Sequence, residues 1–93
     1  MIIIYGGVRV DPAREAEITA KGTVFQEKCQ AEEGCQAYLL SWDIAGSHTV
    51  RLVEVWADED SYLGHKEQDH VGEWTDYMKQ VGLEPPAFVR TDC

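Results

Sequence analysis

Basic residues and long apolar segments are both scarce in this chain of 93 residues. Eight Lys and Arg stand against 17 Asp and Glu, which gives a formal net charge of −9. The basic residues are scattered, so nucleic acid and anionic membrane surfaces are poor partners. No apolar run approaches the roughly 20 residues that span a bilayer. The apolar start at 1–5 has no basic leader, so we expect a strand there and not a signal peptide.

The chain also lacks the cysteine spacing of a zinc site. Its three cysteines, Cys29, Cys35 and Cys93, are an odd number without a metal-binding pattern. Without a secretory leader we expect reduced thiols and a cytoplasmic protein. Cys29 and Cys35 are interpreted as buried structural residues, and a disulfide between them is the less favoured alternative.

The first third of the sequence predicts a strand followed by a helix. The apolar run at 2–10 is typical of a buried strand, and the glycine pair at 6–7 indicates a bulge or a close approach to another group. Asp11, followed by proline, marks a helix start. The helix is predicted to end near Glu33, with Gly34 as its left-handed cap.

The remaining two thirds predict three strands and a helix in two pieces. Strands at 35–42 and 48–56 form a hairpin, and a last strand covers 87–91. Between them, Asp58 and Asp69 are predicted to cap two successive helices. The order β-α-β-β-α-β over a single domain, 1–93, predicts an α+β fold of the ferredoxin-like, split βαβ type, with an antiparallel sheet and its helices on one face.

Both faces of this sheet are predicted to be buried. The first strand carries apolar residues at both parities, with Ile2 and Ile4 on one face and Ile3 and Tyr5 on the other. The helices cover only one face, and a second copy related by two-fold symmetry is the simplest cover for the other. The sequence therefore predicts a homodimer through its sheet faces, and a monomer with a partly apolar open sheet is the less favoured alternative.

Short motifs along the chain resemble the antibiotic biosynthesis monooxygenase (ABM) superfamily. They are Glu33-Gly34-Cys35 with Tyr38, then Leu52-Val53-Glu54-Val55-Trp56, Tyr62-Leu63, and the pair His65 and His70. The resemblance extends from Ile2 to about Phe88 and implies a dimeric α+β barrel. Members include cofactor-independent monooxygenases of quinols and polyketide anthrones, haem-degrading enzymes, and proteins of unknown activity.

Asparagine is absent from the sequence. The haem-degrading branch places an asparagine on the first strand, where this chain has Tyr5, Gly6 and Gly7, so the resemblance argues against haem degradation. Some polyketide oxygenases also use an asparagine as hydrogen-bond donor to the substrate, so their site does not carry over directly.

A carboxylate and a histidine are the candidate catalytic residues. Glu54 and Trp56 share parity, which places both under the helices. A buried carboxylate must be paired, hydrogen-bonded or protonated, so Glu54 orients a histidine or substrate hydroxyl, or it is a structural acceptor. His65 lies where the helical cover is interrupted, which favours a pocket mouth and a proton acceptor near neutral pH. His70, near the start of the next helix, is the weaker candidate.

No cofactor is expected. The sequence has no nucleotide-binding glycine fingerprint and no flavin or metal signature. The five-residue spacing of His65 and His70 places them on different helical faces, so a metal site formed by the two with Glu54 is not expected. Our hypothesis makes His65 the proton acceptor and Glu54 its orienting partner. The remaining substrate-binding candidates are Trp56, Tyr38, Tyr5, His70 and Tyr62.

An oxygenase without a cofactor needs a substrate that itself gives an electron to oxygen. The predicted function is therefore monooxygenation of a small aromatic quinol or polyketide-type substrate by dioxygen. The alternatives are a non-catalytic dimer that binds a small hydrophobic ligand, and a cofactor-free polyketide cyclase or isomerase.

Overall fold

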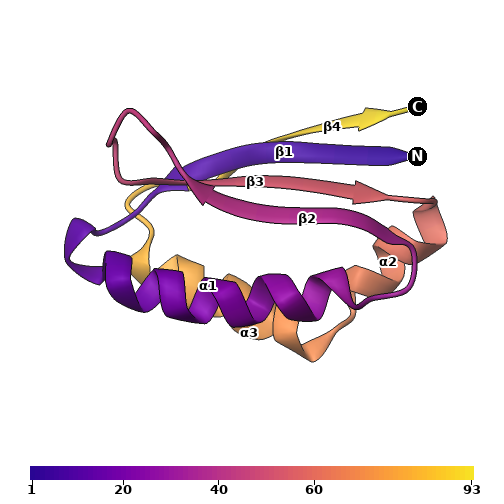
Figure 1. Cartoon of the computed structure of the whole chain (residues 1–93), viewed down its shortest axis with the longest axis horizontal. Coiled ribbons are helices and arrows are strands. Elements are labelled where there is room, and N and C mark those ends of the chain that lie inside the picture. The colour runs from indigo at the N-terminus through magenta and orange to yellow at the C-terminus, as the bar shows by residue number, and fades with distance from the viewer.

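A four-stranded antiparallel sheet lies over three helices in the computed structural model, which describes residues 1–93 (Figure 1). The strands are β1 (Ile2–Arg9), β2 (Cys35–Trp42), β3 (Thr49–Trp56) and β4 (Ala87–Asp92), in the order β2-β3-β1-β4. The helices are α1 (Glu15–Gln30), α2 (Glu59–Lys66) and α3 (Asp69–Val81). The α+β, ferredoxin-like fold predicted from the sequence is confirmed.

The first helix is shorter than predicted at both ends. Asp11 accepts a hydrogen bond from the Ala13 N–H (3.0 Å), but it caps a 3₁₀ turn at Pro12–Arg14, and α1 begins only at Glu15. The helix ends at Gln30 because the chain tightens into turns that lead to β2. Gly34 has the predicted left-handed conformation, with a φ of 79°.

The second helical region is broken, as predicted. Asp58 caps α2, since its carboxylate accepts from the Ser61 N–H at 2.8 Å. The prediction that Asp69 caps α3 is wrong by one residue. Gln68 is the extended residue before the helix, and Asp69 is the first helical residue, where its charge is favourable beside the helix N-terminus. The short break lets α3 leave α2 in a new direction.

The inner face of the sheet carries the core. Ile2, Ile4, Phe25, Cys29, Tyr38 and Trp56 form one buried cluster beneath it. The glycines of β1 serve a close approach and not a bulge: a Cβ on Gly6 would lie 2.0 Å from the carbonyl oxygen of Ala87 in β4. The irregularity in the sheet falls instead in β2, between Cys35 and Ala37.

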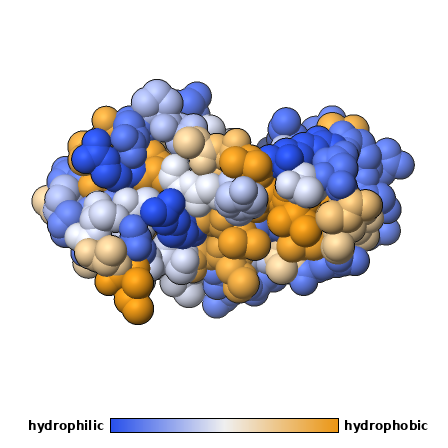
Figure 2. Space-filling model, turned by 90° about the horizontal axis from the view of Figure 1, so that it is seen from above, coloured by the Kyte–Doolittle hydropathy of each residue, from blue (hydrophilic) through white to orange (hydrophobic).

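The outer face of the sheet is apolar and uncovered. Tyr5 lies opposite Val53 and Val89, and Val53 lies opposite Leu39, so these side chains form one patch across the four strands. All four are between 40% and 53% exposed. Figure 2, which looks down on this face, shows apolar groups gathered over the sheet. No helix of the chain combines the length and apolar character needed to cross a bilayer.

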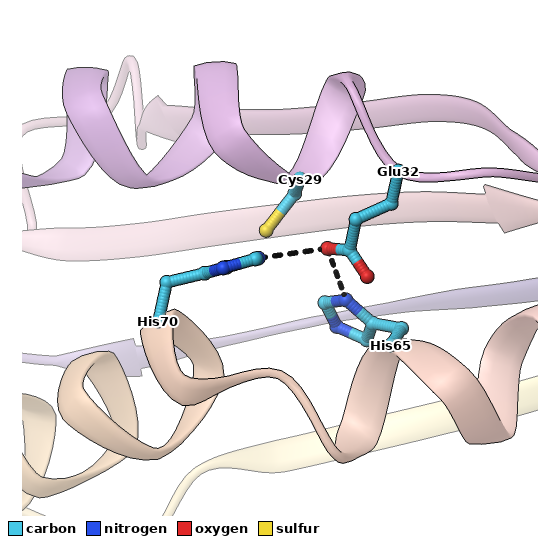
Figure 3. A group of neighbouring side chains, drawn as sticks. All are labelled: Cys29, Glu32, His65 and His70. Carbon is cyan, nitrogen blue, oxygen red and sulfur yellow. Dashed lines mark hydrogen bonds and ion pairs between the residues drawn. The ribbon is translucent and has the colours of Figure 1, made fainter.

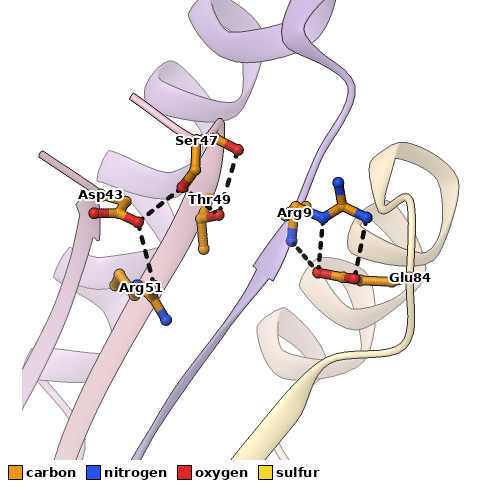
Figure 4. A network of polar contacts seen from close by, with 6 residues as sticks. All are labelled: Arg9, Asp43, Ser47, Thr49, Arg51 and Glu84. Atoms are coloured by element: carbon orange, nitrogen blue, oxygen red, sulfur yellow. Dashed lines mark hydrogen bonds and ion pairs between the residues drawn. The ribbon is translucent and has the colours of Figure 1, made fainter. Parts of the chain in front are cut away.

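Polar contacts close the end of the fold that lies away from the α2–α3 break (Figure 4). In the β2–β3 turn, Asp43 accepts hydrogen bonds from the Ser47 hydroxyl (2.7 Å) and Arg51 (3.2 Å). The Arg9 guanidinium and backbone N–H reach Glu84, which tethers the segment between α3 and β4. His48, predicted to be the first residue of β3, lies just before it with a φ of 54° and is exposed, as expected.

Candidate active site

Two histidines and one glutamate meet at the break between α2 and α3 (Figure 3). His65 lies in the last turn of α2, His70 in the first turn of α3, and Glu32 in the turn that follows α1. The Glu32 Oε2 atom lies 2.9 Å from His65 Nδ1 and 2.9 Å from His70 Nε2. One carboxylate oxygen therefore joins both imidazoles.

The five-residue spacing of His65 and His70 does not separate their side chains in the structure, contrary to the expectation from the sequence. A continuous helix would have sent residues five apart in different directions, but α2 ends at Lys66 and α3 starts at Asp69. The two helices approach Glu32 from different sides, so both imidazoles point at it. The Cys29 thiol points toward the same group (Figure 3). Burial, and secondarily Glu32, raise the pKa of this thiol well above its usual range.

Glu54 lies on the other side of His65. Its Oε1 atom is 3.9 Å from His65 Nε2 and accepts a hydrogen bond of 2.8 Å from the Trp56 indole N–H. Glu54 is 5% exposed. Burial raises the pKa of its carboxyl, and the Trp56 hydrogen bond and the nearby His65 offset part of that rise. Glu54 thus faces a histidine and accepts a structural hydrogen bond at the same time.

Aromatic rings enclose His65. The ring centroid of Trp56 lies 4.5 Å from that of His65, and the centroid of Tyr38 lies 5.5 Å away. Both aromatic residues are buried. Tyr62 is half-buried and packs against the same core cluster. His65 is only 5% exposed, so most of its ring is packed in the core and little of it faces solvent.

Tyr5 does not join this group. Its side chain belongs to the outer face of the sheet, opposite Val53, and is 49% exposed. The assignment of Tyr5 as a wall beside His65 is therefore wrong in the isolated chain, because β1 directs Ile4, and not Tyr5, toward the helices.

Two hollows meet at His70. The first, a cleft of about 760 Å³ at the helix break, is lined mostly by polar residues, among them Glu32, His65 and His70. The second, a groove of about 390 Å³ between α1 and α3, is lined by Phe25, Trp74 and other apolar residues, and by His70 at its end. The break in the helical cover thus opens on a polar cleft, and the aromatic hollow lies beside it.

Glu32 is the central residue that the sequence analysis missed. It follows the helical face formed by Phe25 and Cys29, at a spacing of three residues from Cys29. That spacing continues the buried face past the end of α1, and an acidic residue on a buried face is a signal for a site. Its side chain is 10% exposed and is paired only with the two histidines.

Comparison with known proteins defines the family. The family model described as "Antibiotic biosynthesis monooxygenase" matches residues 1–77, and the chain belongs to this family. No curated protein sequence matches it.

Solved structures share the fold at low sequence identity. A conserved protein from Methanosarcina mazei Go1 is 21% identical, with a TM-score of 0.89 over 97% of this chain and 89% of the other. A structure described as an antibiotic biosynthesis monooxygenase is 18% identical, with a TM-score of 0.91 over 100% and 98% of the two chains. Rv0793 from Mycobacterium tuberculosis is 16% identical, with a TM-score of 0.89 over 99% and 93%.

Proposed function

We propose that the chain is a cofactor-independent monooxygenase that inserts one oxygen atom into a small aromatic quinol or anthrone-type substrate. The observation that carries the proposal is the position of His70, which joins an aromatic groove to the buried Glu32 and His65. Family membership supports the same class of reaction.

The groove between α1 and α3 is suited to a flat ring. Phe25 and Trp74 lie stacked on its wall, with ring centroids 4.9 Å apart and planes 10° from parallel. Its volume of about 390 Å³ falls within the usual range for small-molecule sites. Lys21 and Lys28 also line it, and their charges would stabilise a substrate that has lost a proton.

In this proposal the substrate hydroxyl donates its proton to the two-histidine group. His70 contacts the ring hydroxyl, and Glu32 holds His70 and His65 in one chain of hydrogen bonds. His65, named from the sequence as the proton acceptor, stands behind Glu32, with its Nε2 atom 3.9 Å from Glu54. A histidine oriented by a carboxylate is an effective general base near neutral pH.

The oxygen chemistry then belongs to the substrate. The deprotonated ring gives one electron to dioxygen, and the resulting radical pair combines to form a peroxide on a ring carbon. His70 returns the proton to the peroxide. Loss of one water, made from the outer OH group and the hydrogen of that ring carbon, then breaks the O–O bond and leaves one oxygen atom on the ring. For a hydroquinone the products are a hydroxyquinone and water, so all four oxygen atoms and six hydrogen atoms are accounted for.

The proposal includes a homodimer through the outer sheet face. Four apolar side chains from the four strands, Tyr5, Leu39, Val53 and Val89, lie together on a face that no part of the chain covers. Such a patch marks an interaction surface, and two-fold pairing of the sheets would bury it. A cytoplasmic location is proposed with it, because all three cysteines are free.

Oxygen uptake with a panel of hydroquinones and anthrones tests the proposal. Under oxygen-18 gas, we expect one molecule of dioxygen consumed per ring and one labelled atom retained in the product. Saturable binding without oxygen uptake would indicate the ligand-binding alternative, and ring closure or isomerisation without uptake would indicate the cyclase alternative. Either result contradicts the proposal, as does the absence of any turnover.

A further inference from the structure

The four side chains in Figure 3 point toward one another. The Cys29 sulfur, a Glu32 oxygen, and one nitrogen from each of His65 and His70 all lie within 4.8 Å of one another. In a tetrahedral zinc site with bonds of 2.0–2.3 Å, the donor atoms are about 3.3–3.8 Å apart. Shifts of about 1 Å therefore convert the present hydrogen-bonded group into a coordination shell.

We propose that Cys29, Glu32, His65 and His70 form a site for one divalent transition-metal ion of the zinc type per chain. A sulfur, two imidazole nitrogens and one carboxylate oxygen form a donor set that suits zinc and its neighbours in the first transition row. Magnesium and calcium prefer sites made of oxygen donors alone. The metal would replace the thiol proton of Cys29, because a coordinating thiol is deprotonated.

The surroundings of the four residues fit a metal. His65 Nε2 faces Glu54, which is itself fixed by Trp56, so the ring that would bind a metal through Nδ1 is oriented by a carboxylate on its far side. This is a common arrangement behind metal-binding histidines. Glu32 and Glu54 form ion pairs only with these imidazoles, so a bound divalent cation would offset most of the negative charge of the two acids and the Cys29 thiolate.

An entry path is present. Glu32, His65 and His70 line the cleft of about 760 Å³ at the helix break, and Asp58 and Asp60 lie in the same cleft. The acidic residues would attract a cation toward the site. Cys29 lies deepest, fully buried at the end of α1, so the metal would be held between the three segments that meet there.

This inference does not rest on the proposed oxygenase activity. A metal would replace the hydrogen bonds between Glu32 and the two imidazoles on which the proposed reaction depends, so the site cannot serve both uses at the same time. The metal site stands if no substrate is ever oxidised, and the oxygenase proposal stands if no metal binds.

Cobalt and zinc binding to the whole chain test the site. The chain is first freed of metal with a chelator and then titrated with Co²⁺ and, in a calorimeter, with Zn²⁺. We expect one ion per chain, a strong visible absorption typical of tetrahedral cobalt, and a thiolate-to-cobalt band in the near ultraviolet. A stoichiometry of zero, or a spectrum of six-coordinate cobalt without the thiolate band, overturns the proposal.

Variants assign the ligands. Cys29→Ser should abolish the thiolate band, and Glu32→Gln should weaken Zn²⁺ binding by at least about 10-fold. His48→Gln and Cys93→Ser are matched controls, because both residues are exposed and outside the cluster, and both variants should bind as the wild type does. Loss of the thiolate band in Cys93→Ser overturns the proposal. If Cys29→Ser does not fold, unchanged Zn²⁺ affinity in Glu32→Gln overturns it as well.

Discussion

Replacing Trp56 by phenylalanine tests the packing that holds Glu54 beside His65. Trp56 is fully buried, and its indole N–H is the hydrogen-bond donor to Glu54. Losing buried volume that is not refilled costs about 1 kcal/mol or more, and a buried acceptor without its donor costs about 1–3 kcal/mol. We therefore expect Trp56→Phe to lower the free energy of unfolding by about 2–4 kcal/mol.

Trp42→Phe is the matched control. Trp42 is only half-buried, and its indole N–H donates to the Thr19 hydroxyl (3.0 Å), an exposed contact that water can replace. We expect a cost of about 1 kcal/mol there. Adding Glu54→Gln to Trp56→Phe should recover part of the loss, because an uncharged amide is less costly to leave unpaired than a carboxylate.

Urea denaturation at one fixed protein concentration measures these differences, since association would otherwise change the apparent stability. Thermal unfolding provides a second reading, with a decrease in Tm of at least about 8 °C for Trp56→Phe. A loss for Trp56→Phe within about 0.5 kcal/mol of that for Trp42→Phe would refute the reasoning. The Trp56–Glu54 contact would then not be what stabilises this part of the core.

Three further predictions concern other parts of the fold. Val53→Lys places a charge in the apolar outer face and should convert a dimer into monomers, as measured by light scattering; an unchanged mass would argue against pairing through this face. Gly6→Ala should destabilise the chain by about 1–3 kcal/mol, because the new Cβ meets β4. Gly72→Ala, in open space on α3, should instead stabilise it by up to about 1 kcal/mol. Equal effects of the two substitutions in urea denaturation would contradict this prediction. The Ser47 hydroxyl is the largest cause that holds the pKa of Asp43 below 3.8, so the stability from this carboxylate is present above pH 3.8 and is lost as the pH falls through the lowered pKa. In Ser47→Ala, the pKa of Asp43 measured by carbon NMR should rise toward 3.8, and an unchanged value would exclude the hydroxyl as the cause.

The layers of the fold could be predicted because they follow from periodicity. The alternation along β3 placed Glu54 and Trp56 under the helices, and the structure has both there. Two aspartates predicted the break after α2, because each is typical of a helix start. Asp58 caps α2, and Asp69 is the first residue of α3 and not its cap. Local patterns of this kind depend on few neighbours, so a single sequence is enough to read them.

The composition of the site could not be predicted in the same way. Glu32 lies beyond the end of α1, and although its spacing from Cys29 continues the buried face, the sequence does not show that two histidines from other helices meet it there. His65 and His70 come together because of the angle between α2 and α3. A spacing of five residues in the sequence does not predict that angle. The position of Tyr5 was predicted wrongly because the register of β1 with β3 decides which side chains of β1 face the helices. In that register Ile4 lies opposite Glu54, and Tyr5 lies opposite Val53 on the outer face.

Turnover of an accepted hydroquinone by three histidine variants tests the central claim most directly. His70→Gln removes the imidazole that joins the aromatic groove to Glu32, and His65→Gln removes the one behind it. The account predicts a fall in kcat of at least about 100-fold for His70→Gln and a marked fall for His65→Gln. The exposed control His48→Gln should keep the wild-type rate. A folded His70→Gln variant that consumes oxygen as fast as His48→Gln would contradict the account.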